Sequence, residues 1–250
     1  MVASTPKPAS ARPRNAGASR SAILEQAVAE FAAQGVAGAR TAAIAEAAGV
    51  NKALLYYYFK DKESLYAASL QAVFSGFAEE LMPVLESPLS PGEKLLRFAR
   101  AHFEYLVRHP NYPRLIQQEL SCAGSRGEPS GGFRDISTAH FLPMQRAGMR
   151  VVKQGIASGE LRPVEGAGTL SAVIGMNVFY FISAPIMRAL RGADPFSPRA
   201  RRAHIASSLD FIAASLFTDR RHGISLAQKI AEAPSALPRK PQNGPSEVRS

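Results

Sequence analysis

The sequence contains a single cysteine, Cys122, and no tryptophan among its 250 residues. One cysteine can form neither a disulfide within the chain nor a multi-cysteine zinc site. Histidine is also sparse, and no histidine stands at metal-ligand spacing with a partner: His102, His109, His140, His204 and His222. We therefore expect no bound metal and no cofactor.

Arrangements suited to catalysis are lacking as well. Cys122 has no base that the sequence places beside it, and a buried thiol is the simpler interpretation. The acidic residues Glu25, Glu46 and Asp135 show no pairing suited to acid–base chemistry. The glycines at 131–132 do not follow a strand, so they are not a phosphate-binding loop. We expect that the protein is not an enzyme.

A secretory signal is missing too, because residues 1–17 contain no apolar segment. The stretch 170–187 carries no charge and approaches the ~20 residues that cross a bilayer. It nevertheless contains several polar or helix-disfavouring residues: Ser171, Gly175, Asn177, Ser183 and Pro185. A helix buried inside a protein or a dimer explains this composition better. We expect a cytoplasmic protein without a membrane partner.

The formal net charge of +10 is a weak argument for a nucleic-acid partner. Basic and acidic residues balance within 21–62, and the excess lies in residues 1–20, the body and the C-terminal end. Where the charges lie is therefore more informative than their sum. Hydrophobic residues make up 46% of the chain, which is enough for a substantial core.

Apolar residues recur at helical spacing almost throughout, and no segment alternates as a strand would. The sequence predicts an all-α fold of about nine helices: 19–34, a short one from 41, 52–59, 62–85, 91–109, 112–122, 135–158, 166–191 and 197–218. We expect a flexible loop at 123–132 and disordered tails at 1–17 and 222–250. Between the tails we place a DNA-binding domain at 18–62 and a helical ligand-binding and dimerisation domain at 63–221.

Residues 41–62 have the pattern of a helix-turn-helix. Thr41 is a good N-cap for a short helix, Gly49 ends that helix in a tight turn, and Asn51 is the N-cap of the next helix. Leu55 and Phe59 lie one turn apart and would hold this second helix against the protein.

The opposite surface of the second helix suits a polyanion. Lys52 and Tyr56 are one turn apart on it, and no acidic residue occurs from Ala47 to Lys60. Two other interpretations stay open at this point. The tyrosines could be an ordinary packing surface, or the same face could bind protein in a helical adaptor without specific DNA binding.

The segment also resembles the N-terminal domain of tetracycline-repressor (TetR) family regulators, from Arg20 to Tyr66 without interruption. The residues that carry the resemblance are Arg20, Ile23–Leu24, Phe31–Ala32, Gly35, Thr41, Ile44–Ala45, Ala48–Gly49–Val50, Asn51, Lys52, Leu55–Tyr56, Phe59, Lys62–Glu63 and Leu65–Tyr66.

The resemblance implies a palindromic DNA operator as partner. It assigns DNA binding to Thr41, Lys52, Ala53, Leu54, Tyr56, Tyr57, Tyr58 and Lys62. Of these, Thr41 and Lys62 would contact the DNA backbone. Some family members carry a basic residue just after Thr41, where this chain has Ala42, so base readout there is open. Arg12 and Arg14 could reach a minor groove, or belong to a solubilising tail.

By the same resemblance, the remaining helices bind an inducer and form a homodimer, and the protein is a repressor released from DNA by a small, mostly apolar molecule. Candidate ligand contacts are Phe98, His102, Tyr105, Gln118, Phe141, Met144 and Asn177, most of which could equally be core. Candidate interface residues on the last two helices are Val173, Phe181, Ile205, Leu209, Ile212 and Leu216, with burial inside one protomer as the alternative.

Overall fold

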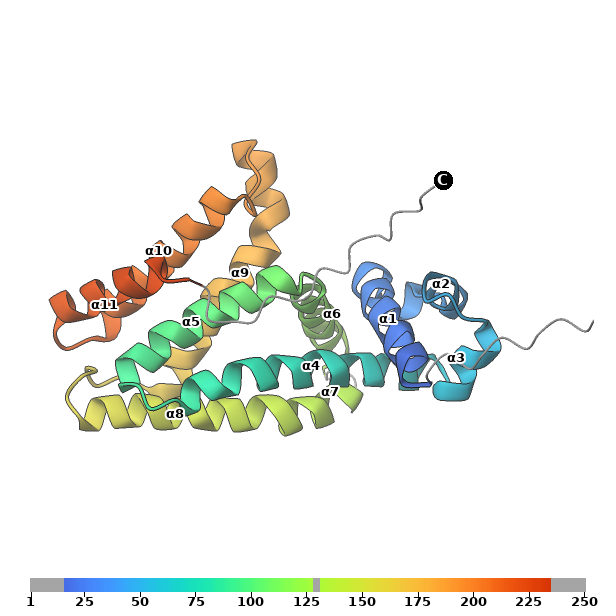
Figure 1. The fold of residues 1–250 in the computed structure, drawn as a ribbon, viewed down its shortest axis with the longest axis horizontal. Helices are drawn as coiled ribbons and strands as arrows, with labels where there is room; N and C mark the ends of the chain where they lie inside the picture. The colour runs from blue at the N-terminus through green and yellow to red at the C-terminus, as the bar shows by residue number, and fades with distance from the viewer. Residues whose placement is uncertain (1–15, 128–130, 235–250) are drawn as a thin grey trace, which may run out of the picture. The chain divides into compact units, whose positions relative to one another are not determined.

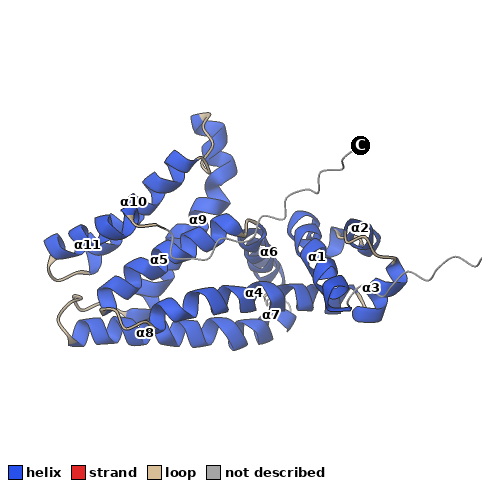
Figure 2. Ribbon diagram, in the orientation of Figure 1, coloured by secondary structure: helices blue, strands red, loops and turns tan. Residues whose placement is uncertain are grey.

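The computed structural model describes residues 16–127 and 131–234, and they fold almost entirely as helices (Figures 1 and 2). Within this described part, the extended pairing consists of an isolated antiparallel bridge between Leu161 and Phe217. The predicted all-α class is confirmed. The chain divides into two compact units, Met1–Ser69 and Leu70–Ser250. Of the predicted tail at 1–17, residues 1–15 lie outside the described residues, whereas residues 16 and 17 already belong to a helix.

The N-terminal unit consists of α1 (Ala16–Gly38), α2 (Thr41–Ala47), α3 (Lys52–Tyr58) and the beginning of α4 (Lys62–Glu86). Its core collects the apolar face of α1 and the inward residues of the other helices: Ile23, Ala27, Phe31, Ile44, Leu55, Phe59, Leu65 and Tyr66. The rings of Phe31 and Tyr66 meet edge to face at 4.9 Å. Such aromatic contacts fix the start of α4 against α1.

Gly35 interrupts α1 where the sequence predicts the helix to stop. Its φ of 68° lies in the left-handed region that favours glycine, and one further helical turn follows it to Gly38. The ammonium group of Lys62 donates to the carbonyl oxygens of Ala37 and Ala39 at 3.2 and 3.3 Å. A cation at these carbonyls stabilises the end of α1.

The C-terminal unit continues with α5 (Pro91–Arg108), α6 (Asn111–Arg126), α7 (Gly131–Ile136), the π-helix η1 (Ser137–Phe141), α8 (Leu142–Ala157), α9 (Gly166–Arg191), α10 (Pro198–Leu216) and α11 (Arg220–Glu232). Helix α5 packs against α8, α9, α10 and α11, so it forms the centre of the unit. Ser90 caps α5 by accepting from the Glu93 amide, and Pro91 occupies its first turn.

Two predicted boundaries in this unit are wrong. Helix α6 continues to Arg126, into the predicted loop, and ends at Gly127 with φ 77°. The predicted helix 135–158 is instead α7, η1 and α8 in succession.

The predicted tail at 222–250 is wrong over its first part, because Asp219 caps a further helix, α11, whose residues Gly223, Ala227 and Ile230 are buried. Residues 235–250 of that tail lie outside the described residues. The helical spacing of Gly223, Ala227 and Ile230 is a sequence pattern that predicts α11. The scarcity of aromatic residues in this segment instead favoured the prediction of a disordered tail.

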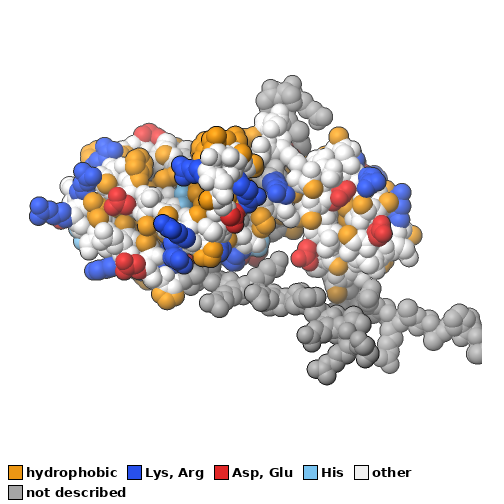
Figure 3. Space-filling model, turned by 90° about the horizontal axis from the view of Figure 1, so that it is seen from above, with side chains coloured by type: hydrophobic (Ala, Val, Ile, Leu, Met, Phe, Trp, Pro, Cys, Tyr) orange, Lys and Arg blue, Asp and Glu red, His pale blue; other side chains and the backbone are white. Residues whose placement is uncertain are grey.

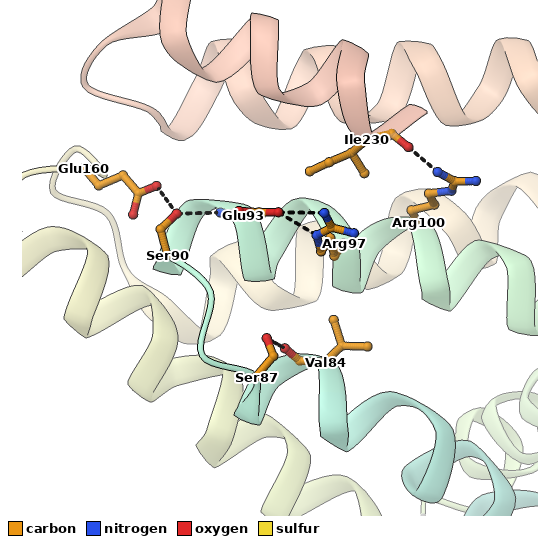
Figure 4. A network of polar contacts seen from close by, with 8 residues as sticks. All are labelled: Val84, Ser87, Ser90, Glu93, Arg97, Arg100, Glu160 and Ile230. Carbon is orange, nitrogen blue, oxygen red and sulfur yellow. Dashed lines mark hydrogen bonds and ion pairs between the residues drawn. The ribbon is translucent and has the colours of Figure 1, made fainter. Parts of the chain in front are cut away.

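Polar contacts join the start and the middle of α5 to distant parts of the chain (Figure 4). The carboxylate of Glu160, in the loop before α9, accepts from the Ser90 hydroxyl at 2.7 Å and the Gly92 amide at 3.1 Å. Further along α5, Arg100 donates to the carbonyl oxygens of Ile230 and Ala233 at the end of α11. Helix α11 is therefore an integral part of the C-terminal unit.

Candidate nucleic-acid interface and ligand pocket

Helices α2 and α3 form a helix-turn-helix through a tight glycine turn. Gly49 adopts a φ of 65°, and the Val50 amide donates to the Ala45 carbonyl at 3.0 Å. A left-handed conformation at this position favours glycine over other residues. The side chain of Asn51 then accepts from the Leu54 amide at 2.7 Å and begins α3. The predicted turn and the predicted Asn51 cap are confirmed.

The predicted role of Thr41 as an N-cap is wrong. Arg40 is the capping residue of α2 without a side-chain bond, and its amide donates to the Glu30 carboxylate of α1 at 3.1 Å. Thr41 is already helical, and its hydroxyl lies 3.1 Å from the phenol oxygen of Tyr56. The hydroxyl is thus directed towards α3, where it helps to fix an exposed tyrosine.

Helix α3 has an anchored side and an exposed side, as predicted. Leu55 and Phe59 are buried, whereas Tyr56 and Tyr57 are 41% and 80% exposed. The Lys52 ammonium lies 5.8 Å from the centre of the Tyr56 ring, which is a cation–π distance. The surface therefore presents one cation and several hydroxyl donors, which is the chemistry that contacts phosphates and base edges.

The other predicted DNA-contacting residues divide into two groups. Ala53 is exposed beside Lys52, whereas Leu54 and Tyr58 are half-buried at the sides of α3. The Tyr58 ring packs edge to face against Tyr57 at 5.3 Å. The ammonium group of Lys62 is engaged at the end of α1, as described above, so the structure gives it a capping role inside the protein.

A pocket of about 390 Å³ lies in the C-terminal unit between α4, α5, η1, α8 and α9. Three of the seven predicted ligand contacts line it, namely Phe98, Phe141 and Met144. Sequence reasoning missed the rest of the lining: Leu85, Ser137, Thr138, Leu142, Gln145, Leu170, Ser171 and Ile174. These residues come from four separate elements, so the sequence contains no local signal that groups them.

The other four predicted ligand contacts do not line this pocket. Asn177 donates from its amide nitrogen to the Ala99 carbonyl at 2.8 Å and lies 3.3 Å from His102 Nδ1. Its carbonyl oxygen lies 3.0 Å from His204 Nε2. Together these contacts form a polar network that joins α5, α9 and α10. Burial lowers the pKa of His102 to about 3, so its ring is neutral at physiological pH.

Tyr105 and Gln118, the remaining two predicted ligand contacts, also lie away from the pocket. The hydroxyl of Tyr105 donates to the Val73 carbonyl at 3.2 Å, and burial raises the pKa of this phenol. Gln118 is half-buried on α6. Both stay predictions as ligand contacts, outside this pocket.

The last long helices, α9 and α10, expose an apolar face that differs from the predicted one. Val173, Leu209, Ile212 and Leu216 are buried within the protomer, and Phe181 and Ile205 are half-buried. The exposed apolar side chains are Phe179, Ile186, Leu190 and Phe211, at 69, 61, 74 and 63% exposure. Figure 3 shows hydrophobic side chains gathered at the projecting end of α9. We call these four residues the outer apolar face.

The outer apolar face is continuous with a groove of about 790 Å³ between α9 and α10. Phe179 and Phe211 line this groove together with Val173, Ile212 and Leu216. Three of the predicted interface residues are therefore at the groove, although little of their surface is exposed. Among the described residues, α9 is also the helix long and apolar enough to cross a membrane. The core helix of a soluble protein has the same length and composition.

Within residues 16–127 and 131–234, no cluster of three or more His, Cys, Asp or Glu side chains could hold a metal ion. The side chain of Cys122 lies outside the described part of the structure. The described surfaces are thus an exposed basic and aromatic helix, an apolar pocket and an apolar outer face.

An anchored recognition helix that follows a glycine turn defines a helix-turn-helix DNA-binding protein. Residues 23–69 match the family described as bacterial regulatory proteins, tetR family, and residues 91–212 match the tetracyclin repressor-like C-terminal domain. The chain belongs to the tetR family. It is accordingly a regulatory protein with the DNA-binding domain of this family.

Individual relatives agree with this assignment. The chain is 36% identical to the repressor SCO4008 of Streptomyces coelicolor, over 59% of this chain and 74% of that protein. It is 27% identical to the repressor NicS of Pseudomonas putida, over 63% of this chain and 66% of that protein, just under two thirds of its length. The solved structure of AibR with isovaleryl coenzyme A and operator DNA has a TM-score of 0.62 at 18% identity and covers 79% of this chain and 97% of that one. It shows the same fold.

Proposed function

We propose that this repressor reads a palindromic operator with the exposed side of α3, using Lys52, Ala53, Tyr56 and Tyr57. The observation that supports this most directly is the division of α3 into two sides. Leu55 and Phe59 anchor it, and the cation and phenols opposite are exposed. An α-helix presented in this way fits the major groove of B-DNA.

The local charge supports the same surface. No acidic residue occurs from Ala47 to Lys60, so the turn and α3 offer nothing that repels phosphate. Asp61, the next residue, is occupied at the start of α4, where its carboxylate accepts from the Ser64 amide at 2.7 Å. This bond lowers the pKa of Asp61. The proposal also includes a contact between Thr41 and the phosphate backbone of the DNA.

We place the dimer contact on the outer apolar face. Phe179, Ile186 and Leu190 are separated by seven and four residues, which puts them on one side of α9. A large apolar patch left exposed on a soluble protomer marks an interaction site. Burying it against a second copy also accounts for the membrane-like composition of α9. A two-fold dimer would present two α3 helices about 34 Å apart, or a multiple of that, to successive major grooves.

The ligand that releases the operator is proposed to bind the 390 Å³ pocket. Helix α4 begins in the N-terminal unit and contributes Leu85 to the pocket lining. We consider two conformations of the protein, one that fits the operator and one that fits it poorly. A ligand that binds the second conformation more tightly shifts the population towards that conformation. The size of the shift is limited by the difference between the ligand's affinities for the two conformations. The proposal includes a cytoplasmic location and no enzymatic activity.

Electrophoretic mobility shift with the DNA upstream of the protein's own gene tests the proposal. At low salt we expect a retarded complex with the mass of a dimer on one duplex. The absence of a shift at low salt would favour the alternative function, a helical adaptor whose tyrosine face binds protein.

A further inference from the structure

A separate groove of about 750 Å³ lies along the exposed side of α8. It shares no lining residue with the 390 Å³ pocket. Most of its lining comes from α8, and Val164 and Gly166 line it from the segment that leads into α9. Its volume lies within the roughly 300–1,000 Å³ typical of small-molecule sites.

The α8 residues of the groove form two rows of different chemistry. The first row consists of cations that lie within about 60° of one another around the helix: Arg146, Arg150 and Lys153. The second row, on the adjacent side, is apolar: Met149, Val152 and Ile156. All three cations are exposed, whereas Ile156 is half-buried and Val152 is buried. The groove therefore has an apolar floor and a cationic rim.

The cations of the rim have no carboxylate partner within the described residues. The arginines of the neighbouring α5 differ, because Arg97, Arg100 and Arg108 each form an ion pair with a glutamate. Like charges three or four residues apart on a helix repel one another and destabilise it. The row on α8 thus opposes the folding of its own helix, which favours a role in binding an anion.

Nearby acidic residues do not neutralise the rim. No aspartate or glutamate occurs from Ile136 to Gly159. The next acids along the chain are engaged elsewhere. Glu160 accepts from the Ser90 hydroxyl and the Gly92 amide at the start of α5. Glu165 caps α9, where its carboxylate accepts from the Ala167 amide at 2.8 Å.

The loop that carries Val164 is fixed by backbone hydrogen bonds. The Leu161 amide donates to the Gly155 carbonyl of α8 at 2.9 Å, and the Arg162 amide donates to the Leu216 carbonyl of α10 at 2.9 Å. The side of the groove opposite the rim is therefore in place before a ligand arrives. A site formed in advance loses less entropy on binding.

We propose that this groove binds a small single-chain amphiphile with an anionic head such as a carboxylate. Arg146 and Arg150 hold the head, since a guanidinium group can donate two parallel hydrogen bonds to a carboxylate. The chain lies over Met149, Ile156 and Val164. A protein partner fits less well, because a stable protein interface takes about 20–30 residues a side, whereas nine residues line the groove. The site goes beyond the proposed function, since it uses neither the DNA-binding surface nor the 390 Å³ pocket.

Calorimetric titration of the full chain with three probes tests the proposal. Decanoate carries both the chain and the anionic head, decyltrimethylammonium has the same chain with a cationic head, and acetate has the head without the chain. We expect decanoate to bind at least about tenfold more tightly than either of the others, because only decanoate satisfies both the rim and the floor.

Matched variants locate the bound probe. Arg146→Gln and Arg150→Gln should each weaken decanoate binding by about two- to tenfold, between the effect of an exposed ion pair and that of a charge-assisted hydrogen bond. The control is Arg199→Gln, which removes an exposed arginine of α10 outside the groove and should bind decanoate as the wild type does. Met149→Ser should also weaken decanoate binding, because it removes apolar surface from the floor.

Urea unfolding separates binding from folding. Arg146→Gln and Arg150→Gln replace exposed residues with another good helix former and relieve repulsion, so they should unfold at the same urea concentration as the wild type or a higher one.

Four results would overturn the proposal. They are failure of decanoate to bind the wild type, equal binding of decanoate and decyltrimethylammonium, unchanged decanoate affinity in both arginine variants, and an equal loss in Arg199→Gln. Binding of the chain to phosphatidylglycerol vesicles without binding of decanoate would also overturn it and assign the groove to a membrane surface. None of these results affects the proposed operator binding, which mobility shift measures without any amphiphile.

Discussion

The hydroxyl of Thr41 lies 3.1 Å from the phenol oxygen of Tyr56, so the first residue of α2 is joined to the exposed side of α3. Both residues belong to the proposed DNA-binding surface. The bond holds the tyrosine in place before DNA arrives, which reduces the entropy that binding must remove.

We expect Thr41→Val and Tyr56→Phe each to weaken operator binding by about two- to tenfold per half-site, since each removes a net hydrogen bond in each protomer. Because the two hydroxyls share one bond, the loss of affinity in the double variant should be smaller than the sum of the two single losses. A double-mutant cycle by fluorescence anisotropy measures this coupling. Losses that simply add would show that the residues act independently.

Lys52→Ala should weaken DNA binding and reduce the slope of log affinity against log salt by about 2, because a dimer loses one phosphate contact, worth about 0.9, in each half-site. Titrations at several salt concentrations provide the slope. The control is Lys153→Ala, which removes an exposed cation of α8 and should leave affinity and slope unchanged. An unchanged slope together with unchanged sequence preference in Lys52→Ala would remove this residue from the interface.

Phe179→Arg should convert the dimer to monomers at micromolar concentration, because it places a charge on the outer apolar face, where the dimer contact is proposed. Sedimentation equilibrium measures the mass directly. Leu120→Arg is the matched control, since Leu120 is a similarly exposed apolar residue on α6, at 59%. A dimer that persists in Phe179→Arg would place the interface elsewhere.

The buried ring of His102 predicts a pH-dependent stability. Its pKa is about 3 in the folded protein, against 6.5 for an unperturbed histidine. Below pH 6.5 the unfolded state binds the proton more readily, so the free energy of unfolding should decrease as the pH falls from 6.5 towards 3. The decrease from this residue reaches at most about 1.4 kcal/mol per pH unit.

Urea unfolding at pH 7.5, 6 and 5 checks this dependence. His102→Phe should reduce the slope between pH 6.5 and 5 and leave the part that comes from His204, whose pKa burial also lowers, to about 4. His222→Gln, at an exposed position of α11, should follow the wild type. The same slope in His102→Phe and in the wild type would contradict the assignment.

Local features of the DNA-binding unit could be predicted from the sequence because each rests on neighbouring residues. Asn51 caps the helix that follows it, and Leu55 and Phe59 are one turn apart, so their roles need no tertiary information. Thr41 was misassigned because a capping residue and a first helical residue look alike in sequence. Only the tertiary position of Tyr56 shows that the Thr41 hydroxyl contacts α3 and does not cap α2.

The C-terminal unit was harder to predict for physical reasons. Helix α9 is apolar on all sides, so periodicity could not distinguish the side that faces the core, with Val173, from the side that is exposed, with Phe179. The pocket could not be predicted because Leu85 and Ile174 meet only through the tertiary fold. The π-helical turn at 137–141 could not be predicted either, because its residue types do not distinguish it from an α-helical turn.

Selection of duplexes from a random double-stranded DNA library by the full chain tests the central claim most directly. A dimer that reads DNA with two α3 helices should enrich an inverted repeat whose half-sites lie about 10 base pairs apart, or a multiple of that, centre to centre. The enriched duplex should bind Tyr56→Phe and Lys52→Ala more weakly than the wild type. No enrichment, or an enriched sequence without two-fold symmetry, would contradict the account.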